Sequence, residues 1–195
     1  MSEVAPYSEA ITETSKAVGK SIDLVRDFGQ PVAEAYGLVI GDRIEARRER
    51  NLDAMTRRTR AILRERALLE AAPVAEAIAI PLLKAAEGEP RSEMLEWWAT
   101  LLANAMDPAR QNEVRKEFIA VVRDFHPTDA IVLKKMADLY RLDFAPAAAL
   151  RDANISETSV SVSLRNLYMK GCADENNANY RITPFGIELV RACSS

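Results

Sequence analysis

His126 is the only histidine among the 195 residues, so any histidine-based chemistry would depend on this one side chain. A Ser-His-Asp triad, a phosphate-transfer relay or a histidine metal cluster would each need it together with partners that the sequence does not mark. His126 precedes Pro127, Thr128 and Asp129, which is typical of a helix start, with proline early in the helix and a carboxylate in the first turn. We therefore expect His126 to serve at the beginning of a helix.

Motifs of nucleotide-binding and hydrolytic enzymes are missing from the sequence. GxxxxGK[ST], GxGxxG and GxSxG do not occur, and the seven glycines are scattered singly. Cys172 and Cys193 form no CxxC pair, and Cys172 follows an expected helix end, where the negative end of the dipole raises the pKa of a thiol. We predict a protein that is not an enzyme, with no catalytic residue, no cofactor and no metal site.

The sequence has one basic stretch, between Asp42 and Arg66, in which acidic residues are interleaved with arginines. Several of these acidic residues stand three or four positions from an arginine, where the two side chains can pair along a helix. The mixed pattern favours a solvated helix face, and a surface for an anionic partner is the alternative. The candidate residues of that anionic-partner face are Arg47, Arg50, Arg57, Arg58 and Arg64.

A second candidate surface lies on a helix that we expect to begin at Ser156 and to stop at Gly171. As the third helix of a winged helix-turn-helix, it would be placed to enter the DNA major groove. The candidate recognition residues are Ser159, Ser161, Ser163, Arg165, Asn166 and Lys170. However, eight basic and eight acidic residues cancel over residues 127–195, and Asp174 and Glu175 would repel phosphates. Contact with protein or dimerisation is therefore at least as well supported as DNA binding.

Amphipathic helices must position these residues, because apolar side chains recur at steps of three and four along most of the first 125 residues. The expected helices cover residues 8–28, 31–66, 92–106 and 114–125. Pro73, Pro81 and the step from Gly88 to Pro90 should divide the middle into short helices, since proline ends or kinks a helix. Trp97 and Trp98 cannot both face inward equally, so one is expected in the core and the other at a packing edge.

Residues 126–195 have a different pattern. Three helices, a hairpin and a closing helix are expected to begin near His126, Pro146, Ser156, Cys172 and Thr183, respectively. This order is that of a winged helix-turn-helix. The predicted fold class is mainly α, with an N-terminal helical domain over residues 1–125 followed by a winged helix-turn-helix-like module with a small β-hairpin over residues 126–195.

Charge and hydropathy limit the partners and the compartment. Lysine and arginine total 26 against 29 aspartates and glutamates, a net charge of −3, so the whole chain has no electrostatic bias toward nucleic acid. A membrane-spanning helix needs about 20 apolar residues, and the longest uncharged apolar-rich stretch covers only residues 97–106. The first residues lack the basic start and apolar core of a secretory signal. We predict a cytoplasmic protein with no transmembrane segment.

Four stretches of the chain resemble the Abi-alpha family, bacterial proteins associated with abortive infection. These stretches are PVAEAYGLVIGDRIEARRERN, LLKAAEGEPRSEMLEWWATLLANAMDP, HPTDAIVLKKM and YRITPFGIELVRAC. The most specific piece is LEWWATLLANAMDP, because helical periodicity alone does not demand its order of Trp, Leu, Asn and Asp-Pro. The family brings no assigned active site. The resemblance implies a defence function, in which the infected cell stops growing or dies before phage can spread.

The residues and the resemblance together predict a non-enzymatic bacterial anti-phage defence (abortive infection) protein that acts through macromolecular binding, with a protein partner or self-association. The alternative is a winged-helix DNA-binding transcriptional regulator, which the serine-rich third helix motivates. A membrane-acting toxin is a third reading, in which the helix over residues 32–44 and its basic continuation meet anionic lipid.

Overall fold

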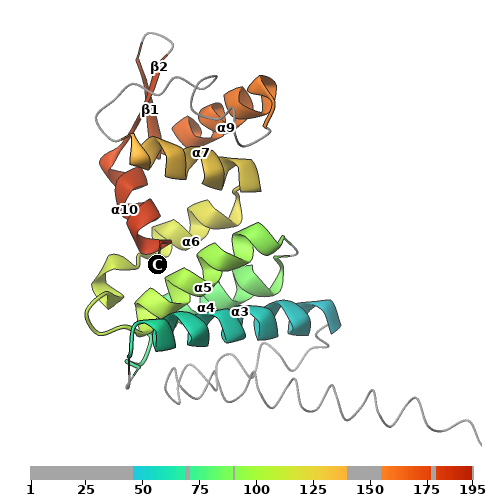
Figure 1. The fold of residues 1–195 in the computed structure, drawn as a ribbon, viewed down its shortest axis with the longest axis vertical. Coiled ribbons are helices and arrows are strands. Elements are labelled where there is room, and N and C mark those ends of the chain that lie inside the picture. Colours follow the sequence, from blue (N-terminus) through green and yellow to red (C-terminus); the bar gives the residue numbers. More distant parts are fainter. Residues whose placement is uncertain (1–45, 69–70, 90, 140–154, 177–178, 195) are drawn as a thin grey trace, which may run out of the picture. The chain divides into compact units, whose positions relative to one another are not determined.

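The computed structural model describes residues 46–68, 71–89, 91–139, 155–176 and 179–194 (Figure 1). Within these ranges the chain is mainly helical, with one two-stranded antiparallel sheet. It divides into two compact units, the first ending at Ile119 and the second comprising Ala120–Ser194. The helices predicted over residues 8–28 and 146–153, and the first part of the helix predicted from Pro31, lie outside the described residues. The domain boundary predicted after residue 125 stays a prediction.

Helix α5 (Ser92–Met106) is central to the first unit. It packs against α3 (Ala46–Glu65), α4 (Glu76–Glu87) and the short 3₁₀ helix η1 (Gln111–Glu113) (Figure 1). Because it has neighbours on several sides, all its residues from Trp97 to its end are buried. Trp97 and Trp98 are only 2% and 0% exposed, so the prediction that one of them lies at a packing edge is wrong.

The bounds predicted for α5 are confirmed, but the role predicted for Pro81 is wrong. Pro81 lies inside α4 and does not divide it. Proline removes one backbone N–H from the helix, which frees the carbonyl group four residues earlier. Pro81 is exposed, so solvent can reach that side of the helix.

Helix α3 ends in a turn of the Schellman type. The Leu68 N–H donates to the Leu63 carbonyl at 3.0 Å, and the Ala67 N–H donates to the Arg64 carbonyl at 2.9 Å. The turn puts Ala67 at φ +54°, a left-handed conformation that usually belongs to glycine. An alanine at this position costs free energy that a glycine would not.

Helix α6 (Lys116–Arg123) crosses from the first unit into the second along the chain. The second unit continues with α7 (Pro127–Asp138), α9 (Glu157–Met169), the strands β1 (Ala173–Asn176) and β2 (Asn179–Ile182), and α10 (Pro184–Ala192) (Figure 1). Helix α7 packs against α9, α10 and β2. The strands pair antiparallel, with Ala173 opposite Ile182. Buried apolar residues of this unit include Val132, Leu133, Met136, Val160, Leu164, Leu167 and Leu189.

Capping residues fix the helix starts of the second unit, as the sequence predicts. The side chains of His126, Ser156 and Thr183 accept hydrogen bonds from backbone N–H groups in the first turns of α7, α9 and α10. Gly171, the predicted stop after α9, has φ +71°. These local signals place α7 and α9, which carry the candidate site.

No helix within the described ranges is long and apolar enough to cross a membrane.

Candidate functional site

An open groove of about 370 Å³ lies in the second unit, between the first turn of α7 and one side of α9. We call it the α7–α9 groove. Eight of its nine lining residues carry a hydroxyl, carboxylate, imidazole or amide group, although most of the groove surface is apolar. The lining residues are Asp124, His126, Thr128, Asp129, Thr158, Ser159, Val162, Ser163 and Asn166.

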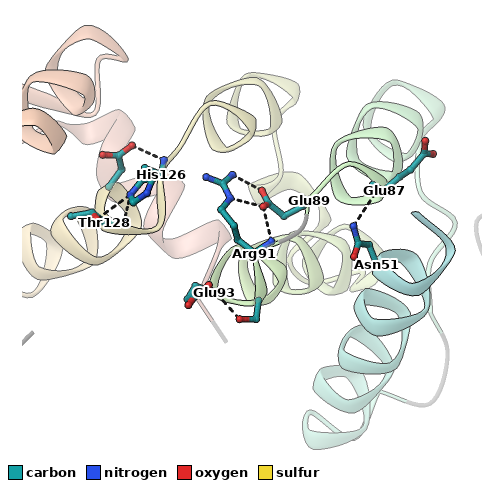
Figure 2. Close-up of polar contacts among 9 residues, drawn as sticks. Asn51, Glu87, Glu89, Arg91, Glu93, His126 and Thr128 are labelled. Atoms are coloured by element: carbon teal, nitrogen blue, oxygen red, sulfur yellow. Dashed lines mark hydrogen bonds and ion pairs between the residues drawn. The ribbon is translucent and has the colours of Figure 1, made fainter. Parts of the chain in front are cut away.

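The start of α7 organises one wall of this groove. His126 caps the helix: its Nδ1 accepts from the Thr128 N–H at 3.3 Å and lies 3.0 Å from Thr128 Oγ1 (Figure 2). In return, Asp129 Oδ2 accepts from the His126 N–H at 2.8 Å, which completes a capping box. The prediction that His126 serves at a helix start is confirmed.

Two lining residues, one on each helix, link α7 to α9. Asn166 Nδ2 donates to Asp129 Oδ2 at 2.7 Å, although 37 positions separate these residues. Asp129 is a carboxylate with only 3% of its surface exposed. The two hydrogen bonds satisfy one of its oxygens and keep the side chain in a single position.

One lining residue, Asp124, forms an ion pair. Lys170 Nζ lies 2.5 Å from Asp124 Oδ2. The hydrogen bond from Lys170 holds the pKa of Asp124 below its usual range, against the weaker opposing effect of burial. Asp124 is therefore neutralised by a cation of the same unit.

The six candidate recognition residues separate into two groups. Ser163 is buried, Asn166 is bound to Asp129, and Lys170 is paired with Asp124. These three side chains serve the α7–α9 groove or its edge. Sequence periodicity could not show this, because it gives the face of a helix but not the partner across it.

The other three candidate recognition residues, Ser159, Ser161 and Arg165, are exposed on α9, and Ser159 also lines the groove. The Ser159 hydroxyl contacts that of Ser156, and the Ser161 hydroxyl donates to the Glu157 carbonyl. Arg165 lies over the Tyr168 ring and 3.9 Å from Glu175.

Two large apolar side chains share the exposed part of α9. Val162 and Met169 are 66% and 67% exposed, and their seven-residue separation puts them on the same side of the helix. Together with Arg165 between them, they form what we call the α9 outer face. An apolar face around an arginine is typical of protein contacts rather than of base readout.

All five candidate anionic-partner residues lie on α3. The side chain of Arg47 is outside the described part of the structure. Arg57 pairs with Asp53 along the helix. Arg58 forms two hydrogen bonds to Glu96 of α5, at 2.7 and 2.8 Å, and pairs with Glu65. The Glu96 carboxylate is the main reason that the pKa of Arg58 is raised. Arg58 thus links two helices of the first unit.

Arg50 and Arg64 remain exposed, and neither forms an ion pair with any residue that the structure describes. With Arg57 they follow a seven-residue spacing, which puts the three arginines on one side of α3. Whether this side meets an anionic partner stays a prediction.

A buried polar cluster in the first unit escaped the sequence analysis. Arg66 Nη1 donates to Asn104 Oδ1 at 2.7 Å and lies 3.6 Å from Asp107. Burial lowers the pKa of Arg66, helped by the nearby charge of Arg110. Asn104 sits among the apolar residues of α5, and a polar residue at such a position signals a buried partner. The Asn and Asp-Pro of the LEWWATLLANAMDP stretch therefore hold the end of α3.

A second buried charge lies between α4 and α5. Glu89, 5% exposed, accepts hydrogen bonds from Arg91 Nε at 2.5 Å, Arg91 Nη2 at 2.6 Å and the Arg91 N–H at 3.0 Å (Figure 2). Burial alone would raise the pKa of Glu89, but the Arg91 hydrogen bonds outweigh it and lower the pKa. The indole N–H of Trp98 adds weakly to this lowering, although it is too poorly placed to count as a hydrogen bond.

The two cysteines lie in the second unit and are both buried. Burial raises the pKa of the Cys172 thiol to about 12, and it raises that of Cys193 well above the usual value. The raised pKa of Cys172 was expected from a helix dipole, whereas desolvation is its main cause. Among the described residues, no three His, Cys, Asp or Glu side chains are placed to hold a metal ion.

Comparison with known proteins gives one match. The model of the family described as abortive infection alpha matches residues 47–179. This range includes α5 with its two tryptophans and all the residues that line the α7–α9 groove. No curated protein and no solved structure matches the chain.

Proposed function

The chain belongs to the abortive infection alpha family, and from this premise we propose that it is a cytoplasmic bacterial anti-phage defence protein that acts by binding another macromolecule. The family match over residues 47–179 is the observation that carries the proposal. In this function the infected cell stops growing or dies before phage can spread.

We propose a mechanism without catalysis. The ring nitrogen Nδ1 of His126 is already used to cap α7, and both thiols are buried with raised pKa values. A nucleophile needs an accessible, deprotonated or activated group. These observations support binding over chemistry at the histidine and cysteines.

The second unit is proposed to be a winged-helix-like module. The order of α7, α9, the β1–β2 hairpin and α10 supports this assignment. In such a module α9 is the third helix, whose outer surface meets the partner.

A protein partner, or a second copy of this chain, fits the α9 outer face better than DNA does. Val162 and Met169 expose apolar surface there, whereas Asn166 and Lys170 are engaged within the unit. The alternative, a transcriptional regulator, would have to read DNA with Ser159, Ser161 and Arg165 and with a module of balanced charge. It stays a prediction.

The function is tested by expressing the chain in a susceptible bacterium and challenging it with a broad panel of phages. Abortive infection predicts fewer plaques, survival of the culture at low multiplicity of infection, and collapse at high multiplicity. Unchanged plating across the panel would contradict the proposal. Survival of every infected cell at high multiplicity would instead indicate a defence that does not sacrifice the cell.

Two variants test whether the α9 outer face carries the activity. Val162→Asn combined with Met169→Gln should abolish protection and leave the melting temperature unchanged, because both side chains are exposed. Ile131→Asn, an equally polar change of an exposed residue on α7, is the matched control and should protect fully. If the double variant protects as well as the control, the α9 outer face is not the contact surface.

The α3 arginines and His126 are tested in the same assay. We expect the Arg50→Gln, Arg57→Gln, Arg64→Gln triple variant to fold and to protect, as a solvated helix face predicts. A folded triple variant without protection would establish an anionic partner. His126→Ser keeps a capping oxygen but removes the imidazole, and full protection is expected. Loss of protection by this variant would contradict a mechanism without catalysis.

A further inference from the structure

Two hydrogen-bonding atoms of the α7–α9 groove are left open. Both hydrogen bonds of Asp129 fall on Oδ2, and Oδ1 accepts none from the residues that the structure describes. The Ser163 hydroxyl likewise forms no hydrogen bond within these residues. Asp129 and Ser163 are each only 3% exposed, and both line the groove. Neither atom is among the fully enclosed polar atoms without a partner, so both keep contact with the groove, where a ligand can reach them.

The charge of the groove identifies the kind of ligand. Asp129 is bound by two neutral donors, the Asn166 amide and the His126 N–H, and no lysine or arginine of the described chain pairs with it. Asp124, by contrast, is neutralised by Lys170. The remaining polar lining consists of hydroxyl, amide and imidazole groups. The groove therefore holds one buried carboxylate without a basic partner among the described residues. The first turn of α7 and the two hydrogen bonds stabilise its charge, and a cation in the groove would stabilise it further.

We propose that the α7–α9 groove binds a protonated amine or guanidinium group, which donates to Asp129 Oδ1 and Ser163 Oγ. The alkyl stem of the same ligand packs on Val162. A cation of this kind supplies both the missing charge and the missing donors, and a hydrogen bond between a cation and a carboxylate is stronger than a neutral one. A groove of about 370 Å³ accommodates a side chain of lysine or arginine size together with some adjoining backbone.

The inference rests on the proposed function in one respect, since it names the chemistry by which a partner is recognised. The same cationic chemistry has two sources, a basic side chain of a partner protein and a free polyamine. Separate probes distinguish these two sources.

Binding is measured by NMR on the ¹⁵N-labelled full chain, with methylguanidinium as the probe and methylurea as its neutral counterpart of nearly equal shape. Methylguanidinium should shift the Asn166 side-chain amide and the Thr128 backbone amide with saturation in the millimolar range, about what a small charged fragment achieves. Methylurea should give shifts at least tenfold weaker at the same concentration. Equal binding of the two probes, or no saturable shift with either, would overturn the proposal.

Variants assign the binding to the open atoms. Asp129→Asn keeps an oxygen for the His126 N–H and removes the charge, and it should weaken methylguanidinium binding at least tenfold. Asp138→Asn removes an exposed carboxylate from the other end of α7 and should leave binding unchanged. Ser163→Ala should weaken binding several-fold without removing a charge, and it serves as the test if Asp129→Asn fails to fold. Binding by Asp129→Asn or by Ser163→Ala at the wild-type affinity would contradict the assignment.

The two sources are compared with blocked arginine amide and spermidine as probes. Tighter binding of the arginine amide supports a protein partner, and tighter binding of spermidine supports a polyamine, while failure of both overturns the proposal. The phage assay separates this inference from the proposed function. A wild-type chain that binds methylguanidinium but does not protect leaves the groove assignment intact and refutes the defence function. A chain that protects but binds no cation refutes the groove assignment and leaves the defence function intact.

Discussion

Replacing Glu89 with glutamine should destabilise the first unit by about 2 kcal/mol at neutral pH. The two side-chain hydrogen bonds from Arg91 are charge-assisted, and each is worth about 1.5–3 kcal/mol against about 1 kcal/mol for a neutral one. Glutamine keeps one acceptor and turns an N–H₂ group toward the other guanidinium donor. The Arg91 side chain is 32% exposed and recovers part of its hydration in the variant. The loss of stability should therefore lie near the lower end of the range that these hydrogen-bond values allow.

The assay is thermal unfolding of the wild-type chain, Glu89→Gln and Glu93→Gln in parallel. For a chain of this length the expected loss corresponds to about 4–8 °C in melting temperature. Glu93 lies in the first turn of α5 but is exposed, so its replacement should cost about 0.5 kcal/mol or less. Equal melting temperatures of the two variants would refute the reasoning.

The pH dependence gives an independent check of the same pair. The pKa of Glu89 is lower in the folded protein than its ordinary value of 4.5, so folding favours the ionised carboxylate. The stabilisation is therefore fully present above the ordinary pKa and is lost as the pH falls through the folded pKa. The difference in free energy of unfolding between wild type and Glu89→Gln should become smaller below about pH 4.5. A difference that stays constant to pH 3 would show that the charge is not its cause.

Three further predictions test the backbone and the thiols. Ala67→Gly should stabilise the chain by about 1 kcal/mol in chemical denaturation, because the left-handed turn favours glycine. As the control, Ala61→Gly inside α3 should cost about 1 kcal/mol. A loss of stability in Ala67→Gly would contradict backbone strain at this position. Gly186→Ala should cost about 3 kcal/mol, since its Cβ would come within 2.3 Å of the Cys172 carbonyl oxygen. Gly88→Ala, with no atom closer than 3.7 Å, should be tolerated, and equal melting of the two would argue against this close approach. The Cys172 thiol, with a pKa of about 12, should react with a disulfide reagent at pH 8 only after denaturant is added; rapid labelling of the native chain would rule out its burial.

Local signals in the sequence were enough to place most helices that the structure describes. Capping by His126, Ser156 and Thr183 depends on residues within one turn, and the bounds of α5 follow from its apolar spacing and from Asp107-Pro108. Such features involve neighbours along the chain, so one sequence is sufficient to predict them.

Features that depend on packing between distant segments were missed. Trp97 and Trp98 are both buried because α5 has helices on several sides, which the period of a single helix does not reveal. For the same reason Asn166 was expected on an outer surface, although its partner is Asp129, 37 positions earlier. Three of the six candidate recognition residues of α9 are thus buried or engaged within the unit, and whether α9 meets a partner stays a prediction.

Hydrogen bonds at the junction of the hairpin with α10 connect three elements of the second unit. The Thr183 hydroxyl donates to the Gly171 carbonyl at 2.7 Å and also accepts from the Gly186 N–H, while the Cys172 carbonyl accepts from the Thr183 N–H. The end of α9, the hairpin and the first turn of α10 therefore share their hydrogen bonds at one point. They should exchange their amide protons with solvent as one cooperative block, rather than fraying strand by strand.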